Sequence, residues 1–306
     1  MQIFSSDRFV LPLPAGHRFP MQKYARLRQR VSAANLTPSN ELCTPPAATD
    51  EQILRAHDWD YWYRVQTGQL TAAEQRRIGF PWSEALVERT QRSAGATIAA
   101  CRAALRDGIS VNLAGGTHHA CRDHGEGFCV LNDSAIAARA LQAEDGIARV
   151  VILDCDVHQG NGTAAILAGD STVFTFSIHG AKNFPFRKTP SDLDIELEDG
   201  CDDASYLAAL ENGLQQALGR ARADLAIYLA GADPFEGDTL GRLAVSKAGL
   251  AQRDRMVFEA CRRAGLPVAV TMAGGYARQI EDTVDIHFQT VQTAAALAAQ
   301  NRMARS

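Results

Sequence analysis

The chain has 306 residues, of which 46% are hydrophobic and 22% charged, so it can bury a sizeable core and is not a disordered polyelectrolyte. Its formal net charge of -4 predicts neither a nucleic-acid surface nor a membrane surface. No segment is apolar enough to span a bilayer, no export signal is recognisable, and the seven cysteines form no C-x-x-C pair, so we expect a cytoplasmic protein.

The amino-terminal third predicts helices separated by a loop. The periodic segments 23–31 and 82–105 are amphipathic, and their basic residues are typical of a solvated helix face. The Pro-rich stretch 37–50 predicts a loop. Neither a repeat nor a convincing linker divides the chain, so we expect a single domain over residues 1–306.

From residue 109 onward, apolar runs alternate with polar, Gly-containing clusters and helical patterns. The runs lie at 109–120, 149–162, 171–180, 224–234 and 266–276, and helical segments at 204–221 and 246–265 separate some of them. Ser246 is a candidate N-cap for the second helical segment. Alternating strands and helices predict an α/β fold with a mainly parallel sheet and helices on both faces.

The segment 149–162 carries the strongest chemical signal. It begins as an apolar strand and then has Asp154, Asp156 and His158 at every second position, which predicts three polar side chains on one face of an extended chain. Burying two carboxylates and an imidazole is costly unless a cation compensates them. Cys155 would point the other way, as a small buried hydrophobe.

Polar residues at other strand ends extend this site. His118 and His119 follow one apolar run, Asp233 ends another, and Tyr276 follows a Gly-Gly turn. Asp233 would join Asp156 and His158 around a divalent metal with an open position. With two imidazoles for proton transfer and a phenol for an oxyanion, this set is typical of amide hydrolysis by activated water.

Five ordered motifs now identify a resemblance. "GGTHHA...GEGFCVLND", "LDCDVHQGNG", "SIHG...FPF", "GADPFEGDTLGRL" and "GGY" together resemble the zinc-dependent histone deacetylase family, over nearly the whole chain. "D-x-D-x-H-Q-G-N-G" and "D-x-x-E-G-D-x-L-G" look most like its class IV branch, in which Gln and Asn stand where other classes have His and Asp. The resemblance implies an arginase/deacetylase-like fold and a lysine deacetylase or deacylase.

The resemblance also implies two cation sites. Zn²⁺ would be bound by Asp156, His158 and Asp233, with Fe²⁺ as the alternative ion because the same ligands take either. An inner site for K⁺ or Na⁺ would use Asp154, Ser177 and backbone carbonyls.

The catalytic set implied by the resemblance is a histidine pair and a tyrosine. His118 and His119 would be general acid and base, and Tyr276 would bind the substrate carbonyl oxygen. Asp154 would orient His118. Asn161 stands where most of the family has an Asp beside the second histidine, so His119 would receive a hydrogen bond acceptor without a charge.

The acyl-lysine channel implied by the resemblance has apolar walls. Phe128 and Phe184 would form the walls, with Gly127 and Gly274 lining them, which suits the aliphatic stem of a lysine. Leu240 occupies the position of a gatekeeper Glu in polyamine-preferring members, which counts against a polyamine substrate. The segment 76–90 has no clear counterpart of the acidic rim loop that grips peptides in other branches.

Several alternatives remain open. The main expectation is an acyl-lysine peptide or protein as substrate. In one alternative the substrate is a small acylated amine. In another, the chain is a catalytically silent acyl-lysine binding protein, although every expected ligand, both imidazoles and Tyr276 are present. Two-manganese chemistry of the arginase type would need extra carboxylate ligands, and none is well placed. His17, His57, His179 and His287 have no motif partner and are interpreted as structural. Asp238 and Glu236 are interpreted as part of a turn that orients Asp233.

Overall fold

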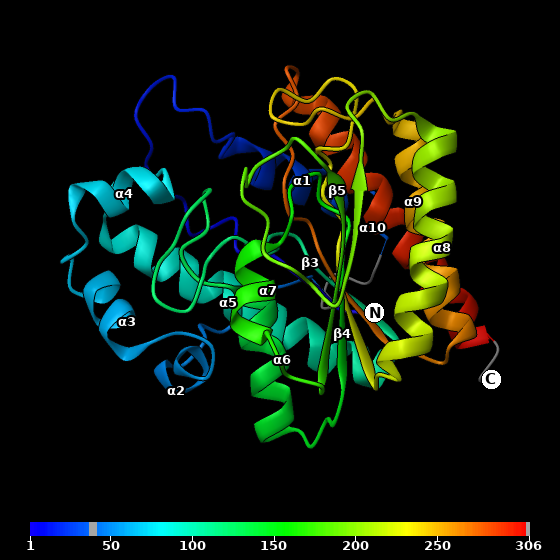
Figure 1. Ribbon diagram of the computed structural model, residues 1–306, viewed down its shortest axis with the longest axis horizontal. Coiled ribbons are helices and arrows are strands. Elements are labelled where there is room, and N and C mark those ends of the chain that lie inside the picture. The colour runs from blue at the N-terminus through cyan, green and yellow to red at the C-terminus, as the bar shows by residue number, and fades with distance from the viewer. Residues whose placement is uncertain (37–41, 304–306) are drawn as a thin grey trace.

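The structure, a computed structural model, describes residues 1–36 and 42–303. These residues form one eight-stranded parallel sheet with helices on both faces (Figure 1). The strands are β1 Ile3–Phe4, β2 Leu42–Cys43, β3 Ile109–Asn112, β4 Val150–Asp154, β5 Val173–Gly180, β6 Leu193–Leu197, β7 Leu225–Leu229 and β8 Val268–Thr271. The helices are α1 Gln22–Ala33, α2 Asp50–Leu54, α3 Trp59–Gln66, α4 Ala72–Ile78, α5 Glu84–Asp107, α6 Asp133–Glu144, α7 Asn161–Leu167, α8 Asp203–Ala221, α9 Lys247–Arg263 and α10 Ile280–Met303.

The strand order β2-β1-β3-β8-β7-β4-β5-β6 puts β3, β8, β7 and β4 side by side in the middle of the sheet. Helices α8, α9 and α10 lie on one side of the sheet, and α5, α6 and α7 lie on the other (Figure 1). The helices on each face pack against the sheet through an apolar core. Every residue of β3, β4, β7 and β8 is buried. Because the strands are parallel, their carboxyl ends open at one edge, where α/β proteins bind their ligands.

Most predicted elements are confirmed, together with the fold class. The five apolar runs contain β3, β4, β5, β7 and β8, and the periodic segments overlap α1, α5, α8 and α9 over most of their length. Ser246 caps α9, because its side chain accepts a hydrogen bond from the amide of Gly249. The loop prediction for 37–50 is wrong in two places, because Leu42–Cys43 forms β2, which pairs with β1, and Asp50 begins α2. Residues 37–41 lie outside the described residues.

The alternating strand predicted through His158 is also wrong, because β4 ends at Asp154. The carboxylate of Asp154 accepts a hydrogen bond from the amide of Asp156 at 3.1 Å, and the carboxylate of Asp156 accepts one from the amide of His158 at 2.9 Å. When a side chain accepts a hydrogen bond from the amide two residues later, the chain turns and leaves the strand conformation. Asp156 and His158 therefore lie on a turn beyond the sheet edge.

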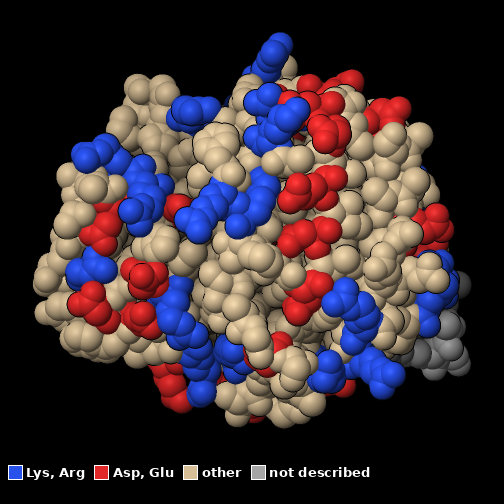
Figure 2. Space-filling view, in the orientation of Figure 1, with Lys and Arg blue, Asp and Glu red and all other residues tan. Residues whose placement is uncertain are grey.

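The surface carries mixed charge. On the face shown in Figure 2, acidic and basic side chains are interspersed, so neither sign dominates that face. Among the described helices, none is both long and apolar enough to cross a membrane.

His57 predicts an acid-sensitive contact in this fold. Its ring is 1% exposed, and Nε2 lies 2.9 Å from the backbone nitrogen of Asn132, the N-cap of α6. Burial lowers the pKa of His57 from 6.5 to about 4. The unfolded chain therefore binds the proton more tightly, and the stability from a neutral His57 is complete above pH 6.5 and is lost as pH falls toward 4.

We expect wild type to lose on the order of 3 kcal/mol of unfolding free energy through His57 across this window. His57→Gln cannot titrate, so its stability deficit relative to wild type should shrink as pH falls from 7 to 4. Denaturant unfolding of both proteins at several pH values measures this difference. A constant deficit would contradict the assignment.

Candidate active site

A cavity of about 670 Å³ opens at the carboxyl ends of the strands. The predicted site residues that line it are His118, His119, Gly127, Phe128, Asp156, His158, Phe184, Leu240, Gly274 and Tyr276. The other predicted residues, Asp154, Asn161, Ser177 and Asp233, are buried beneath this lining. The structure therefore brings the residues of five separate sequence motifs together around one cavity.

The floor of the cavity holds Asp156, His158 and Asp233, whose ligand atoms lie within 4.8 Å of one another. His158 Nδ1 is 2.9 Å from Asp156 Oδ1 and 3.4 Å from Asp233 Oδ2. Burial opposes a charged ring, but the hydrogen bond to Asp156 and the negative charges of Asp156 and Asp233 raise the pKa of His158 to about 10. Burial and the charge of Asp156 raise the pKa of Asp233 to about 7. The cluster therefore strongly favours positive charge at its centre.

Backbone groups hold these carboxylates in place. The amide of Gly274 donates to Asp156 Oδ2 at 2.8 Å, and the amide of Val157 donates to Asp233 Oδ1 at 3.0 Å. Asp233 Oδ2 is buried without a hydrogen bond partner. A Cβ at Gly274 would lie 1.8 Å from this oxygen, so only glycine leaves room for it. An unpartnered buried carboxylate oxygen beside an imidazole nitrogen and a second carboxylate fits a divalent metal ion.

The two histidines after β3 lie above this cluster in different environments. Their ring centroids are 4.1 Å apart. His118 Nδ1 lies 2.6 Å from Asp154 Oδ2, and although burial opposes protonation, Asp154 and Asp156 raise the pKa of His118 to about 9. His119 Nδ1 lies 2.7 Å from Asn161 Oδ1. Burial and the His118 and His158 rings hold the pKa of His119 well below its usual range.

Glu126 contacts this pair in a way that the sequence does not predict. The amide nitrogen of Asn161 donates to Glu126 Oε1 at 2.6 Å, so a carboxylate lies directly behind the amide that faces His119. This bond fixes which end of the Asn161 side chain points to His119. Glu126 belongs to the motif "GEGF", but nothing in the spacing indicates that it meets Asn161.

Two further residues hold the turn that carries Tyr276. Asp238 accepts hydrogen bonds from the amide of Tyr276 at 2.6 Å and from that of Leu240 at 2.7 Å. Asp238 thus holds the segments that carry Tyr276 and Leu240. The prediction that its turn orients Asp233 is wrong, because its side chain makes these hydrogen bonds instead. Lys23 from α1 is 2% exposed, and its ammonium group is 3.4 Å from the carbonyl oxygens of both Ala273 and Gly275.

Aromatic rings form the walls of the cavity. The edge of Phe184 lies against His119 with 4.9 Å between ring centroids, and Phe128 lies 5.8 Å from Tyr276. A Cβ at Gly127, which has φ +57°, would lie 2.6 Å from the His119 ring, so this position also needs glycine. The result is an apolar passage that leads to the polar floor.

The inner cation pair is adjacent in the sheet. Asp154 and Ser177 are register partners in β4 and β5. The hydroxyl of Ser177 lies 2.9 Å from Nδ1 of His179, so this histidine also belongs to the polar interior beneath the site.

Comparisons with known proteins agree with this geometry. Residues 17–291 match the model of the histone deacetylase domain. The chain is 44% identical over 279 residues to an uncharacterized protein of Picosynechococcus sp., covering 91% of this chain and 93% of that protein. It is 31% identical over 283 residues to a histone deacetylase-like amidohydrolase of Pseudomonas aeruginosa, covering 87% and 74%.

The fold matches a crystal structure of a histone deacetylase homolog from Aquifex aeolicus with a TM-score of 0.83 at 22% identity, over 96% of this chain and 83% of that one. The family match covers most of the chain and includes the whole cavity floor. The protein is therefore a hydrolase of the histone deacetylase family.

Proposed function

We propose that the protein hydrolyses the amide of an Nε-acyl-lysine, with Zn²⁺ bound by Asp156, His158 and Asp233 and Fe²⁺ as the alternative ion. The observation that carries this proposal is the buried, unpartnered Oδ2 of Asp233 beside His158 and Asp156 at the base of an apolar-walled cavity. We further propose that residues 1–306 act as one deacetylase-like domain of class IV type. No disulfide joins Cys101, Cys121, Cys129, Cys155, Cys201 or Cys261, which supports our proposal of a reducing, cytoplasmic compartment.

A divalent ion bound by these ligands would supply Lewis acidity toward the scissile carbonyl and the attacking water. Asn161 accepts the Nδ1 proton of His119, which leaves Nε2 free to take a proton from the attacking water. His118, supported by Asp154, carries the positive charge more readily and gives a proton to the leaving amine. The Tyr276 hydroxyl donates a hydrogen bond to the carbonyl oxygen as negative charge develops on it.

Structural features around the cavity support an acyl-lysine in this role. Phe128 and Phe184 suit the aliphatic stem of a lysine, and Gly127 and Gly274 leave the passage open. We propose that Asp154 and Ser177 contribute to an inner K⁺ or Na⁺ site that supports the strand ends.

The rim argues against a cationic small molecule. Four basic residues border the cavity: Arg18, Arg77, Lys182 and Arg242. Leu240 lines the same cavity without a charge. A polyamine would therefore meet positive charge at the rim and no carboxylate at Leu240. Only residues 79–83 separate α4 from α5, so the rim there is short.

Leu240→Glu should raise the ratio of acetylspermidine to acetyl-lysine turnover about fivefold, which corresponds to about 1 kcal/mol for a partly exposed ion pair. Leu240→Gln is the matched control, because glutamine has the shape of glutamate without its charge. Measuring kcat/KM for both substrates tests this change. A wild-type preference for polyamines would overturn the gatekeeper argument.

The function itself is tested with zinc-loaded protein and four kinds of substrate. Fluorogenic acetyl-, myristoyl- and trifluoroacetyl-lysine peptides should be cleaved, and acetylated polyamines should be poor substrates. Chelation should abolish turnover and zinc should restore it. Cleavage of small acylated amines alone would favour the alternative of a metabolite deacylase.

The Asn161 and Glu126 pair gives a separate prediction. Asn161→Asp puts a carboxylate oxygen where the amide nitrogen now donates, 2.6 Å from Glu126, so this variant should lose stability and turnover. Adding Glu126→Gln restores a donor and reverses the direction of the hydrogen bond. We expect a coupling energy of about 1 kcal/mol or more between the two changes, measured by a double-mutant cycle in denaturant. Additive effects would show that this contact does not couple the two side chains.

A further inference from the structure

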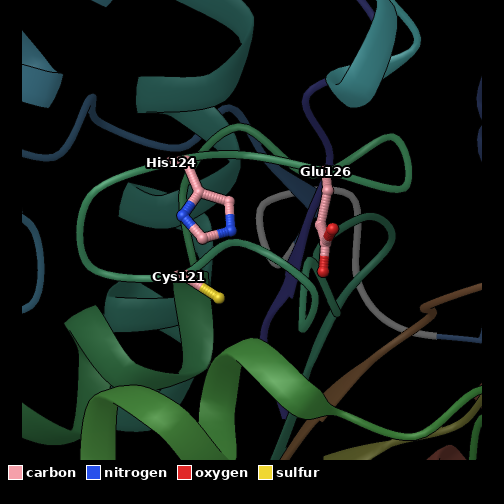
Figure 3. A group of neighbouring side chains, drawn as sticks. All are labelled: Cys121, His124 and Glu126. Atoms are coloured by element: carbon pink, nitrogen blue, oxygen red, sulfur yellow. The ribbon is translucent and has the colours of Figure 1, made fainter. Parts of the chain in front are cut away.

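A second group of metal-ligand types lies beside the active site. Cys121, His124 and Glu126 come from one loop between the histidine pair and the channel wall, and their ligand atoms lie within 4.8 Å of one another. Figure 3 shows the thiol, the imidazole and the carboxylate around a common space. The proposed hydrolysis uses neither Cys121 nor His124.

The loop is folded so that these side chains meet. The amide of Cys121 donates to the carbonyl oxygen of His124 at 2.8 Å, which closes a tight turn. The Nδ1 nitrogen of His124 lies 2.6 Å from the Asp123 carboxylate. A carboxylate in this position binds the Nδ1 proton and leaves the Nε2 lone pair free, which is the arrangement that supports metal-bound histidines in proteins. Glu126 is held on its other side by Asn161.

The groups around the thiol also favour a cation. The Glu126 carboxylate lies within 4.8 Å of the Cys121 sulfur, and the Asp123 carboxylate lies against the His124 ring, so both add negative charge to this loop. A transition metal ion replaces the proton of the thiol and binds the thiolate, and one proton is released to solvent.

We propose that Cys121, His124 and Glu126 bind a second divalent transition metal ion of the zinc type, with water in the fourth position. Thiolate, imidazole and carboxylate are all ligands of tetrahedral zinc. A thiolate disfavours Mg²⁺ and Ca²⁺, which select oxygen ligands. This site differs in composition from the Asp156, His158 and Asp233 cluster, because only this one contains sulfur.

The second site shares Glu126 with the active site. A metal ion bound to Glu126 draws electron density from the carboxylate that holds the Asn161 amide, and this loosens the support of His119. The second equivalent of metal should therefore inhibit turnover, by about tenfold if it acts as the loss of a supporting hydrogen bond does. This coupling rests on the proposed function, whereas metal binding at the loop does not.

Cobalt is a probe that separates the two sites. The protein titrated with Co²⁺ should bind two equivalents, measured by elemental analysis after desalting, and should show a thiolate-to-cobalt charge-transfer band in the near ultraviolet. Cys121→Ser should remove the band and one equivalent, and His124→Gln should weaken both. Cys201→Ser is the matched control, because Cys201 is another partly exposed thiol outside the loop, and it should keep both signals.

A single equivalent in wild type, or a band that survives Cys121→Ser, would overturn the metal site. Turnover is then measured with one and with two equivalents. A fall with the second equivalent that is absent in Cys121→Ser supports the coupling, and equal turnover overturns the coupling alone. An absence of turnover at every loading would count against the proposed hydrolysis and leave the band as an independent result.

Discussion

Replacing Tyr276 with Phe is expected to lower kcat roughly 10²–10³-fold without changing the metal content, because one oxyanion donor is lost. Tyr276 lies at the cavity on a turn held by Asp238, and burial with the charges of Asp156 and Asp233 raises the pKa of its phenol well above the usual range. The hydroxyl therefore stays protonated and acts as a donor. Steady-state kinetics on an acyl-lysine peptide, with elemental analysis of bound metal, measures both quantities.

Tyr24→Phe is the matched control for this experiment. Tyr24 also lines the cavity, and its hydroxyl is near the Arg89 guanidinium. Its loss should leave kcat within a few-fold of wild type. An unchanged kcat in Tyr276→Phe would mean that its hydroxyl does not reach the substrate carbonyl.

Much of the sheet was predictable because local patterns dominate it. The buried strands β3, β4, β7 and β8 appear in the sequence as short apolar runs, and each ends in a polar cluster. The strands that local patterns do not reveal are the two-residue strands β1 and β2 and the mixed-polarity β6, whose residues are only partly buried or exposed apart from the last. Their pairing depends on neighbours distant in sequence, which a local pattern does not contain.

The residues of the candidate site were predictable in type but not in all their contacts. The recurrence of polar residues at the ends of successive strands predicts that Asp156, His158 and Asp233 form one group, and their ligand atoms do lie together. The contacts that support these residues were not predictable. Lys23 contacts Ala273, which is 250 positions away in the sequence, and Glu126 contacts Asn161, which is 35 positions away. Such contacts arise from tertiary packing, so neither periodicity nor spacing predicts them.

Replacing Asp233 with Asn is expected to have opposite effects on the metal-free and the metal-loaded protein. Asn keeps the hydrogen bond from the amide of Val157 but removes the buried charge beside Asp156. Two buried carboxylates in contact with one imidazole repel each other, so the metal-free variant should unfold at a higher temperature than metal-free wild type. The same change removes one of three protein ligands, so metal affinity should fall by about 10²-fold or more, and turnover with it.

In the Cys121→Ser background, which lacks the second metal site proposed above, zinc should therefore raise the unfolding temperature of the protein that keeps Asp233. It should leave that of the protein with Asp233→Asn nearly unchanged, because binding to the folded state is the source of the shift. Asp238→Asn is the control for metal content. Asp238 contacts the backbone of Tyr276 and Leu240 and not the cluster, so this variant should bind a full equivalent even where its turnover falls. Calorimetric scans with and without zinc, read beside elemental analysis, separate a lost ligand from a general loss of structure. An Asp233→Asn protein that keeps both its metal and its zinc-induced shift would show that Asp233 does not bind the ion.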